Sequence, residues 1–564
     1  MFPSGKRTLK SLLRRSCVLY HDRTALSLLD NAPVIYEELG RRVSLLSHDL
    51  LRHGITAGQR VAILSENKPN WGIAFFAITI TGAVAVPVLP DFHGNEVDYI
   101  LRHAGVKALF VSEKQVQKVS KDILASLSAA YLIDDFSRFP SDPEKPLPKE
   151  DSQSIGPELS EIIRSGEKAP ELPDYEPQET DPASIIYTSG TTGLSKGVIL
   201  THLNLIFDAT ATLQIQPVHR EDRLISILPL SHSYECTIGF LIPLMRGACI
   251  TYLDKPPVPG VLLPAMAKVK PTMMMTVPLI IEKIYKKQVL PQLTSSGLRR
   301  ILMKTRLFRT IMHRVAASKI YKLFGGKLRF YGIGGALLSA DVERFLREGK
   351  FPYAIGYGLT ETAPLIAGCS PDKTRYRSTG YAIPGVEIRI HQPLPETGEG
   401  EIQVRGQNVM QGYYMDAEKT REVITEDGWF RTGDLGFIDD DGYLYIRGRL
   451  KNLILGPSGK NIYPEELESI FNKSDYVLES LVYQDQNQLT ARVYLNDDMI
   501  RQEIESQNKN ESEVTDYIRK KLEDLRHFVN TNTAGFSRIT KIIEQTEPFE
   551  KTPTQKIKRY LYTG

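Results

Sequence analysis

The stretch Tyr187-Thr-Ser-Gly-Thr-Thr-Gly-Leu-Ser-Lys-Gly197 decides the interpretation of this chain. It continues the strand-like run SIIYTS and combines three glycines, five serine or threonine hydroxyls and one lysine. Glycines let the backbone turn tightly and present successive N–H groups to one point, while the hydroxyls and Lys196 add donors, as polyphosphate binding requires. It is not a Walker A loop, because Gly197 follows Lys196 where that motif needs Ser or Thr. Composition alone leaves an ordinary flexible loop as the alternative.

The pattern around this loop indicates an α/β protein built from several units. Helical patterns alternate with Val/Ile-rich runs from about residue 34 to 135. They belong to a first unit, residues 1–182, that ends in a connector rich in Pro and acidic residues at 140–182. A second α/β unit spans 183–372, and short strands with turns fill 373–448, where Asp441-Gly442 is a hairpin signal. We therefore predict a large N-terminal domain, 1–448, with two α/β sheet subdomains and a small β-barrel-like subdomain. A small α+β domain, 449–564, follows it.

Composition excludes several classes of protein. With 564 residues, 41% hydrophobic and 24% charged, the chain is neither disordered, fibrous nor a polytopic membrane protein. Its 70 basic and 67 acidic residues leave a net charge of +3, which gives no general case for nucleic-acid binding. Four cysteines without a CxxC argue against a disulfide framework or a zinc site and favour a reducing cytosol.

Two apolar or amphipathic segments invite a membrane interpretation. Charges recur through the first 23 residues, so we expect no cleaved signal peptide, and a basic amphipathic helix here is less favoured than a first helix of the fold. The uncharged run Trp71–Leu89 is just long enough to cross a bilayer. Because Gly82 and Pro87 interrupt it and its second half is rich in Val, we predict a buried helix, a turn and a buried strand.

The loop is the first of seven motifs that resemble, in order, those of the AMP-forming adenylate synthetases, which include acyl-CoA synthetases, peptide-synthetase adenylation domains and luciferases. The others are Leu228-Pro-Leu-Ser-His-Ser-Tyr-Glu235, Gly334-Gly-Ala336, Gly356-Tyr-Gly-Leu-Thr-Glu-Thr362, Thr432-Gly-Asp434 with Gly448-Arg-Leu-Lys451, Gly459-Lys-Asn-Ile-Tyr-Pro-Glu465, and Pro553-Thr-Gln-Lys-Ile-Lys-Arg559. Seven motifs in the family's order make chance agreement negligible.

The resemblance implies a reaction and its catalytic residues. A carboxylic acid attacks the α-phosphorus of ATP to give an acyl-adenylate and pyrophosphate, and the thiol of coenzyme A then displaces AMP. Lys556 would touch the attacking carboxylate and an α-phosphate oxygen together. His232 would line the carboxylate site, and Thr360 would contact phosphate or metal. The family often has Ser-Gly before this lysine, whereas this chain has Thr554 and Gln555.

The same resemblance implies the binding residues. Glu361 and Thr191 would hold Mg²⁺. Tyr357 would stack on adenine, Asp434 would accept from both ribose hydroxyls, and Arg449 would donate to the ribose. The full set expected at ATP or AMP is Thr188, Ser189, Gly190, Thr191, Thr192, Gly193, Lys196, Gly335, Ala336, Tyr357, Gly358, Thr360, Asp434 and Arg449.

Rotation of the small domain is also implied by the resemblance. Lys451 would be the hinge pivot, because a pivot must absorb a large change in φ and ψ. One orientation of domain 449–564 would deliver Lys556 for adenylation. The other would deliver the Gly459 loop, which would line the channel for coenzyme A.

A finer resemblance points to long-chain fatty acyl-CoA synthetases, through LPLSHSYE, KPTMMMTVPLIIEKIY and the TPTQKIKR ending. It implies a medium- to long-chain fatty acid as substrate. An acyl-carrier-protein thiol as acceptor and a catalytically silent fatty-acid binder or membrane scaffold remain alternatives. The four residues Glu361, Asp434, Arg449 and Lys556 argue against a silent protein.

Residues Lys283 to Arg329 contain thirteen Lys or Arg and no Asp or Glu, with Leu, Ile, Met and Phe interleaved. A basic amphipathic helix is typical of a membrane-surface element. The alternative, with equal weight, is a solvated helix paired to acidic residues elsewhere, such as the 140–182 segment. We therefore expect a cytoplasmic protein and leave a peripheral association with the inner face of the membrane open.

Overall fold

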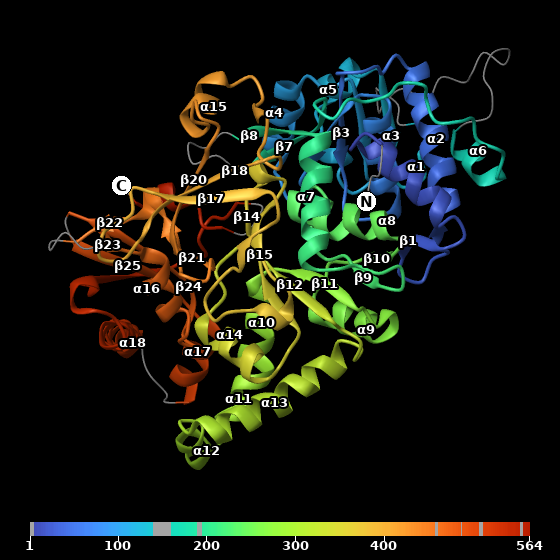
Figure 1. Ribbon diagram of the computed structural model, residues 1–564. Helices are drawn as coiled ribbons and strands as arrows, with labels where there is room; N and C mark the ends of the chain where they lie inside the picture. Colours follow the sequence, from blue (N-terminus) through green and yellow to red (C-terminus); the bar gives the residue numbers. More distant parts are fainter. Residues whose placement is uncertain are drawn as a thin grey trace.

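The computed structural model describes residues 5–138, 159–188, 195–456, 461–486, 488–506, 511–552 and 556–563. It has an α/β architecture with several sheets (Figure 1), as the sequence predicts. The helices outside the segments discussed below are α2 (Tyr36–Arg52), α4 (Gly94–Ala104), α5 (Lys121–Ser126), α6 (Leu159–Ser165), α7 (His202–Ile215), α8 (Ile242–Arg246), α9 (Pro259–Val269), α14 (Ala340–Glu348) and α15 (Ala417–Val423).

The first sheet has seven strands in the order β19-β8-β7-β4-β3-β5-β6. Their bounds are β3 (Arg60–Leu64), β4 (Val84–Val88), β5 (Ala108–Val111), β6 (Ala129–Leu132), β7 (Pro182–Thr188), β8 (Lys196–Thr201) and β19 (Gly412–Tyr413). Strands β3 to β7 pair in parallel, while β8 pairs antiparallel with both β7 and β19. Every residue of β4 is buried, which explains why its sequence VAVPV does not alternate with polar residues.

The run Trp71–Leu89 forms the buried helix, turn and strand that its sequence predicts. Helix α3 (Pro69–Ile80) is buried from Trp71 onward, Gly82 has a φ of +79° in the turn, and β4 follows. Rings of Trp71, Phe75 and Phe76 pack against Phe240, which belongs to the chain segment of the second sheet. Across the described residues, no helix has both the length and the apolar character needed to cross a bilayer.

The second sheet also has seven strands, in the order β13-β12-β11-β9-β10-β1-β2. Their bounds are β1 (Thr24–Leu28), β2 (Val34–Ile35), β9 (Arg223–Ile225), β10 (Cys249–Tyr252), β11 (Met273–Thr276), β12 (Phe330–Ile333) and β13 (Tyr353–Ile355). All pairs are parallel except β1 with β2. The carboxyl ends of β9 and β11 to β13 therefore meet at one edge.

The two sheets exchange strands along the chain. β1 and β2 lie near the N-terminus yet complete the second sheet, whereas β7 and β8 follow residue 181 yet complete the first. The division into sheets therefore does not coincide with our sequence division at residue 183. The exchange interlocks the two α/β units, and helix α1 (Leu9–Leu19) packs into their shared core through Leu9, Leu12 and Leu13.

A β-rich part follows residue 356. It contains a three-stranded sheet, β14-β15-β16, and a four-stranded antiparallel sheet, β17-β18-β20-β21. Their bounds are β14 (Tyr357–Gly358), β15 (Leu365–Gly368), β16 (Tyr381–Ala382), β17 (Val386–His391), β18 (Gly400–Gly406), β20 (Phe430–Ile438) and β21 (Leu444–Arg449). The predicted hairpin at Asp441-Gly442 is confirmed, since it joins β20 to β21 and Gly442 has a φ of +83°.

The remaining residues form a small α+β domain with its own core, at the left of Figure 1. It contains β22 (Ile454–Leu455), β23 (Asn461–Ile462), β24 (Val477–Asp485), β25 (Gln488–Leu495), β26 (Lys541–Gln545), α16 (Pro464–Phe471), α17 (Asp497–Ser506) and α18 (Glu511–Thr531). Its polar contacts with the large domain include Tyr463 Oη donating to Glu399 at 2.6 Å and Lys473 paired with Asp341 at 3.2 Å. The Lys286 ammonium also donates to the Ser474 carbonyl at 3.0 Å.

Candidate active site

Five described residues of the predicted site follow strands of the second sheet at its carboxyl edge. The loop after β9 carries His232, β12 ends just before Gly334-Gly335-Ala336, and β13 leads into Tyr357 and Gly358. Ligands of open α/β sheets bind outside this edge. The topology therefore brings together motifs that are far apart in the sequence.

The backbone conformation at Gly335 and the close packing at Gly358 each require a glycine. Gly335 has a φ of +85°, a left-handed conformation that other residues rarely adopt, and both it and Ala336 are exposed. A Cβ on Gly358 would lie 2.0 Å from the Pro364 carbonyl oxygen. The backbone can therefore approach a flat ligand at the first position and close the β14–β15 turn at the second.

The predicted ribose-binding pair is formed by the register of one hairpin. Asp434 on β20 lies opposite Arg449 at the end of β21, and Arg449 Nε is 2.8 Å from Asp434 Oδ1. The hydroxyl of Tyr357 donates to Asp434 Oδ2 at 2.7 Å. Burial raises the pKa of Asp434, although the charges of Arg449 and Lys556 oppose this rise. Each carboxylate oxygen has a second lone pair, so Asp434 retains the capacity to accept from ribose hydroxyls.

Lys556 reaches this site from the C-terminal domain. Its backbone N–H donates to Thr552 Oγ1 at 3.2 Å, and its carbonyl accepts from the Thr552 N–H at 2.7 Å. Surrounding protein atoms and the charge of Arg449 lower the pKa of its ammonium, while Asp434 and Glu361 act in the opposite sense. The residue is nonetheless exposed by surface area, so it faces an accessible cleft rather than packed core. Within the described residues its ammonium has no hydrogen bond or ion pair, which fits an anionic ligand.

Several cations converge on this cleft. Burial lowers the pKa of Lys451, and the charges of Arg449, Lys196, Arg559 and Lys556 lower it further. Lys451 lies in the short 3₁₀ turn η6 (Leu450–Asn452), immediately after β21. Like charges repel at short range, and a bound polyanion relieves that repulsion. The cleft is therefore electrostatically matched to a polyphosphate.

His232 is held as a neutral hydrogen-bond donor. Its Nδ1 accepts from the backbone N–H of Tyr234 at 3.2 Å, which leaves the proton of the neutral ring on Nε2. Burial, with a smaller contribution from the charge of Lys556, lowers the pKa of His232 to about 4. The ring is thus uncharged at neutral pH and can donate from Nε2 to a carboxylate oxygen. Ser233 Oγ, next to it, donates to Thr360 Oγ1 at 3.5 Å.

Asn67, Ser226 and Glu235 support the His232 loop, and our sequence analysis missed this network. The Asn67 amide donates to Ser226 Oγ at 3.0 Å and to the Leu228 carbonyl at 2.6 Å. Its oxygen accepts from the Leu230 N–H at 2.8 Å. Ser226 Oγ in turn donates to Glu235 Oε1 at 2.6 Å. A glutamate at the head of the apolar run ECTIGFLIPLM was the available signal.

Glu235 opens a π-helical segment, η2 (Glu235–Leu241), and is fully buried. A Cβ on Gly239 would lie 2.5 Å from the Glu235 carboxyl carbon, so the absent side chain leaves room for this carboxyl group. Burial raises the pKa of Glu235 to about 8. The carboxyl group is therefore mostly protonated at neutral pH, when it accepts from Ser226.

Glu361 has a carboxylate of the kind that binds a metal shared with a ligand. Tyr413 Oη donates to Glu361 Oε1 at 2.9 Å, and the Lys196 ammonium lies 5.0 Å from the centre of the Tyr413 ring. The described residues contain no cluster of three or more His, Cys, Asp or Glu suited to a metal. Mg²⁺ commonly takes one or two carboxylates plus phosphate oxygens, so Glu361 fits such an ion. Tyr413 is a further residue that our sequence analysis missed.

Part of the predicted site lies outside the described residues: Ser189, Gly190, Thr191, Thr192, Gly193 and Gly459. Thr188 and Lys196, the described residues of the phosphate loop, are cross-strand partners at the ends of β7 and β8. Thr360 is buried in the turn η4 (Thr360–Thr362), beside Glu361.

An apolar cavity of about 50 Å³ begins beside the His232 loop. Tyr234 lines it, with Tyr234 Oη donating to the Gly332 carbonyl at 3.1 Å. Its wall also includes residues of helices α7 and α8, the η2 segment and strands β9, β11, β12, β13 and β15. An apolar tail attached to a carboxylate at His232 would enter this cavity.

Known proteins are similar to this chain in fold and sequence. The family model described as AMP-binding enzyme matches residues 13–414. Long chain acyl-CoA synthetase 6, peroxisomal, of Arabidopsis thaliana is 30% identical over 504 residues, covering 83% of this chain and 69% of that protein. Long-chain-fatty-acid–CoA ligase heimdall of Drosophila melanogaster is 30% identical over 505 residues, covering 83% and 73%.

A solved structure also matches over nearly the whole chain. ATP-bound MatB from Rhodopseudomonas palustris is 25% identical, with a TM-score of 0.74, covering 99% of this chain and 98% of that one. Its apo form has a TM-score of 0.67. This chain belongs to the family of AMP-binding enzymes, and within that family it is most like the long-chain acyl-CoA synthetases.

The buried carboxyl group of Glu235 makes stability depend on pH. Its pKa of about 8 in the folded protein lies well above the value of about 4.3 for an unfolded chain. Between these values the folded protein keeps a proton that the unfolded chain has lost. The free energy of unfolding therefore falls as pH rises, by at most about 1.4 kcal/mol per pH unit for this group. We expect Glu235→Gln to gain stability relative to the wild type from pH 5 to pH 8 in thermal unfolding.

The exposed residue Glu426 provides the control, and we expect Glu426→Gln to show a nearly constant difference in Tm over the same range. A constant difference for Glu235→Gln as well would contradict a protonated Glu235 in the folded protein.

Proposed function

We propose that this protein is an AMP-forming ligase that joins a medium- to long-chain fatty acid to coenzyme A at the expense of ATP. The observation that carries the proposal is the cleft between the two domains. There the ammonium of Lys556, which has no partner among the described residues, is near the carboxylates of Asp434 and Glu361. A neutral His232 lies two residues before Tyr234, which lines an apolar cavity. Polyphosphate, carboxylate and alkyl chain each meet matching chemistry. The names of the relatives, which specify long-chain acyl-CoA synthetases, support the choice of acid.

In the first step, an oxygen of the fatty carboxylate attacks the α-phosphorus of ATP, and the bond to pyrophosphate breaks. Lys556 would offset the negative charge that builds up around phosphorus, and His232 Nε2–H would orient the carboxylate. Bound Mg²⁺ would neutralise charge on the phosphate oxygens, with Glu361 and Thr191 as its protein ligands. Thr360 would hold a phosphate oxygen. The remaining hydroxyls of the phosphate loop, Thr188, Ser189 and Thr192, would add donors.

The nucleoside would lie over Gly335 and Ala336, where the exposed backbone allows a flat base to approach. The pair Asp434 and Arg449 would bind the ribose. Tyr357 would contact the base with the edge of a largely buried ring, since its hydroxyl already donates to Asp434.

In the second step, the thiol of coenzyme A attacks the acyl carbonyl carbon, and AMP leaves. We propose that domain 449–564 rotates about Lys451 between the steps, so that Lys556 leaves and the Gly459 loop arrives. The domain contacts at Glu399, Asp341 and Lys286 are individual polar pairs, which such a rotation can break.

A carrier-protein thiol is the alternative acceptor, because the residues of the adenylation step do not distinguish it from coenzyme A. The second alternative, a silent fatty-acid binder, would have no use for a convergent set of cations. We favour coenzyme A because the relatives named above are acyl-CoA synthetases and a CoA ligase.

The division of labour between the two steps is testable with Lys556→Ala. We expect adenylation, measured as fatty-acid-dependent pyrophosphate release, to fall by about 100-fold or more, the usual cost of losing a group that stabilises transition-state charge. Thioester formation from supplied acyl-adenylate and coenzyme A should change little. Lys558→Ala is the matched control, since Lys558 lies two residues away and pairs with Glu550 at 3.7 Å. Equal loss of both half-reactions in Lys556→Ala would contradict the proposed roles.

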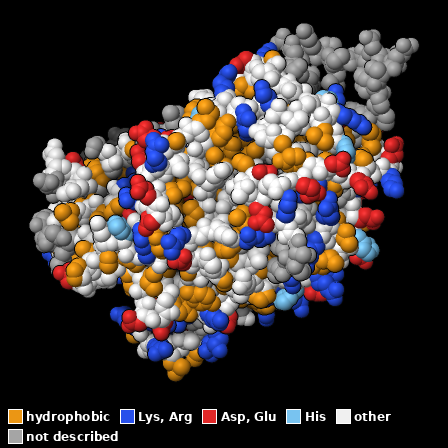
Figure 2. Space-filling model, turned by 45° about the horizontal axis from the view of Figure 1, so that its top comes forward, with side chains coloured by type: hydrophobic (Ala, Val, Ile, Leu, Met, Phe, Trp, Pro, Cys, Tyr) orange, Lys and Arg blue, Asp and Glu red, His pale blue; other side chains and the backbone are white. Residues whose placement is uncertain are grey.

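We also propose that α12 (Gly297–Leu302) and α13 (Arg306–Leu323) form a surface for anionic lipid. Figure 1 shows both helices projecting from the lower edge of the molecule, and the lower projection in Figure 2 carries hydrophobic and basic side chains. Leu307, Ile311 and Val315 recur every four residues on α13 and are 49% to 76% exposed. Leu298 and Ile301 continue this apolar surface on α12.

The charges on these helices favour a membrane over an intramolecular partner. Of the thirteen basic residues from Lys283 to Arg329, three form ion pairs with described residues: Lys286, Arg309 and Arg329. Those at the projection, including Arg300, Arg306 and Arg314, have no acidic partner in the described part of the chain. Each basic side chain held near an anionic bilayer adds about 1 kcal/mol. The protein would then lie in the cytoplasm, peripheral to the inner face of the membrane.

The lipid surface predicts a loss of vesicle binding when its apolar row is made polar. We expect Leu307→Gln with Ile311→Gln to lower partition onto vesicles containing phosphatidylglycerol at least tenfold, because about 0.8 kcal/mol is lost for each methylene that would have been buried. Leu478→Gln in the C-terminal domain, also half exposed, should leave the partition unchanged. Unchanged cosedimentation of the double variant would favour a solvated helix pair.

A further inference from the structure

The apolar cavity runs along the second sheet from the carboxyl ends of the strands toward their amino ends. Its lining includes Gly332, Ile333 and Met275 near the active site, and Phe330, Leu224 and Met273 at the other end. Met273 pairs with both Leu224 and Phe330 in the strand register. From Phe330 to Ile333 the cavity spans about 10 Å at the usual rise of a strand. The cavity is therefore short for the extended chain of a long fatty acid.

Three polar residues stand at the far end, each immediately before a strand. Asp222 precedes β9, Thr272 precedes β11 and Arg329 precedes β12. Because these strands are parallel, their amino ends meet at the edge of the sheet opposite the active site. The residues of the active site and this polar cluster therefore bracket the cavity.

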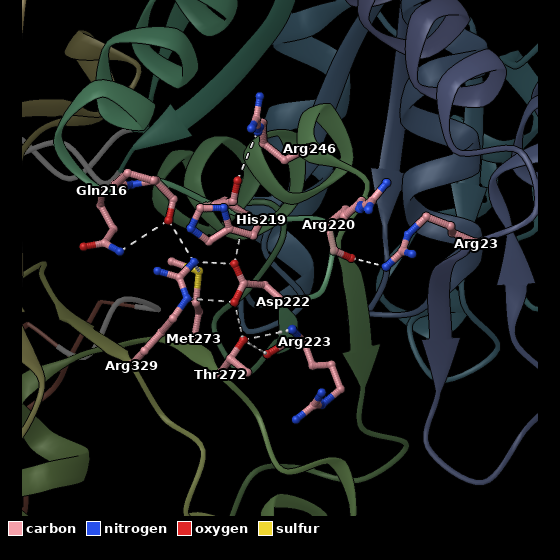
Figure 3. A network of polar contacts seen from close by, with 12 residues as sticks. Arg23, Gln216, His219, Arg220, Asp222, Arg223, Arg246, Thr272, Met273 and Arg329 are labelled. Carbon is pink, nitrogen blue, oxygen red and sulfur yellow. Dashed lines mark hydrogen bonds and ion pairs between the residues drawn. The ribbon is translucent and has the colours of Figure 1, made fainter.

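Figure 3 shows how the cluster is joined. Arg329 forms a two-pronged ion pair with Asp222, in which Arg329 Nε lies 2.8 Å from Asp222 Oδ1 and Arg329 Nη2 contacts Oδ2. Thr272 Oγ1 donates to Asp222 Oδ1 at 2.7 Å, and the His219 N–H donates to Oδ2 at 2.7 Å. Arg329 Nη2 also donates to the Pro217 carbonyl at 2.8 Å. Asp222 is thus buried with four hydrogen bonds, which makes the cluster rigid.

The Arg329 side chain separates the cavity from solvent. On its inner side, Arg329 Nη2 lies 3.3 Å from the sulfur of Met273, which lines the cavity. On its outer side, the Arg329 side chain is 32% exposed. The cavity-lining residues Gln216 and Val218 flank the Pro217 carbonyl that Arg329 holds. Removing this layer would open the cavity to water at its far end.

We propose that the Asp222–Arg329 ion pair, and the Met273 side chain that it holds, form the end wall of the acyl cavity and limit the length of the fatty acid. This inference rests on the proposed function. Methionine is flexible and fills irregular space, so movement of Met273 lengthens the cavity, while the fixed ion pair behind it sets the limit. An acid that is too long must displace the wall and loses binding energy in the transition state.

The test compares kcat/KM for acids from C8 to C20, with pyrophosphate release as the readout. Met273→Ala lengthens the cavity, and the ratio of kcat/KM for C18 over C10 should rise at least tenfold, since one or two methylenes are worth that much discrimination. Leu224→Phe adds bulk at the same end and should lower the ratio. Asp222→Asn combined with Arg329→Gln removes both charges together, so that neither is left buried and unpaired, and it should raise the ratio.

Met274→Ala is the matched control. Met274 is the next residue on β11, is equally buried, and packs into the separate core on the other face of the sheet with Ile225 and Leu262. It loses the same atoms without changing the cavity, so its C18 to C10 ratio should remain that of the wild type. Activity with the C10 acid verifies that each variant is folded.

Wild-type ratios in Met273→Ala, Leu224→Phe and the double variant, with C10 activity retained, would overturn the end wall and leave the proposed function intact. An equal rise of the ratio in Met274→Ala and Met273→Ala would also overturn the end wall. The effect would then come from a nonspecific loosening of core packing and not from a longer cavity. Absence of pyrophosphate release from the wild type with every acid would overturn the proposed function, and the end wall with it.

Discussion

The ion pair between Asp434 and Arg449 is the contact on which the rest of the site depends. It is built by the register of β20 with β21, and it stands where the chain leaves the large domain, two residues before Lys451. A buried carboxylate is costly unless it is paired and hydrogen-bonded. Arg449 and Tyr357 meet that requirement and hold Asp434 in place. The negative charges of Asp434 and Glu361 then stabilise the charged form of Lys556 in the cleft. A single hairpin therefore fixes one side of the nucleotide site and the point about which the second domain would turn.

Local and motif-based features were predictable from the sequence. The buried helix and strand of Trp71–Leu89, the hairpin at Asp441-Gly442 and the α/β class follow from periodicity and turn residues that act over a few positions. The convergence of Asp434, Arg449 and Lys556 was predictable only through the resemblance, because a lone lysine in a basic tail has no signal of its own. Contacts between distant segments were missed. Asn67 reaches Ser226 across 159 positions and Arg329 reaches Asp222 across 107. The membership of β1 and β2 in the second sheet was missed for the same reason. Strand order depends on packing between distant segments, which a short stretch of sequence does not reveal.

The connection between β11 and β12 would serve an apolar substrate in two ways, by binding the membrane and by adjoining the acyl cavity. β11 and β12 line the cavity, and the chain between them forms α10 (Pro278–Ile284), η3 (Tyr285–Val289), α11 (Leu290–Leu293), α12 and α13. The lipid surface proposed for α12 and α13 would bring the enzyme to its substrate. Strands β11 and β12 would then contact the acyl chain, and the Asp222–Arg329 ion pair would close the far end of the cavity. The acid would be kept away from water at each stage except at its carboxylate, which meets His232.

We expect the cleft to activate a fatty carboxylate with ATP and to pass the acyl group to coenzyme A. The most direct measurement is acid-dependent pyrophosphate release from MgATP, with AMP and thioester followed in parallel, for acids from acetate to C18 together with aryl acids and amino acids. Release that is greatest with fatty acids of C10 to C18, accompanied by equal amounts of AMP and acyl-CoA, is the predicted result. Release that is greatest with aryl or amino acids, or pyrophosphate release without an acyl-CoA product, would contradict it.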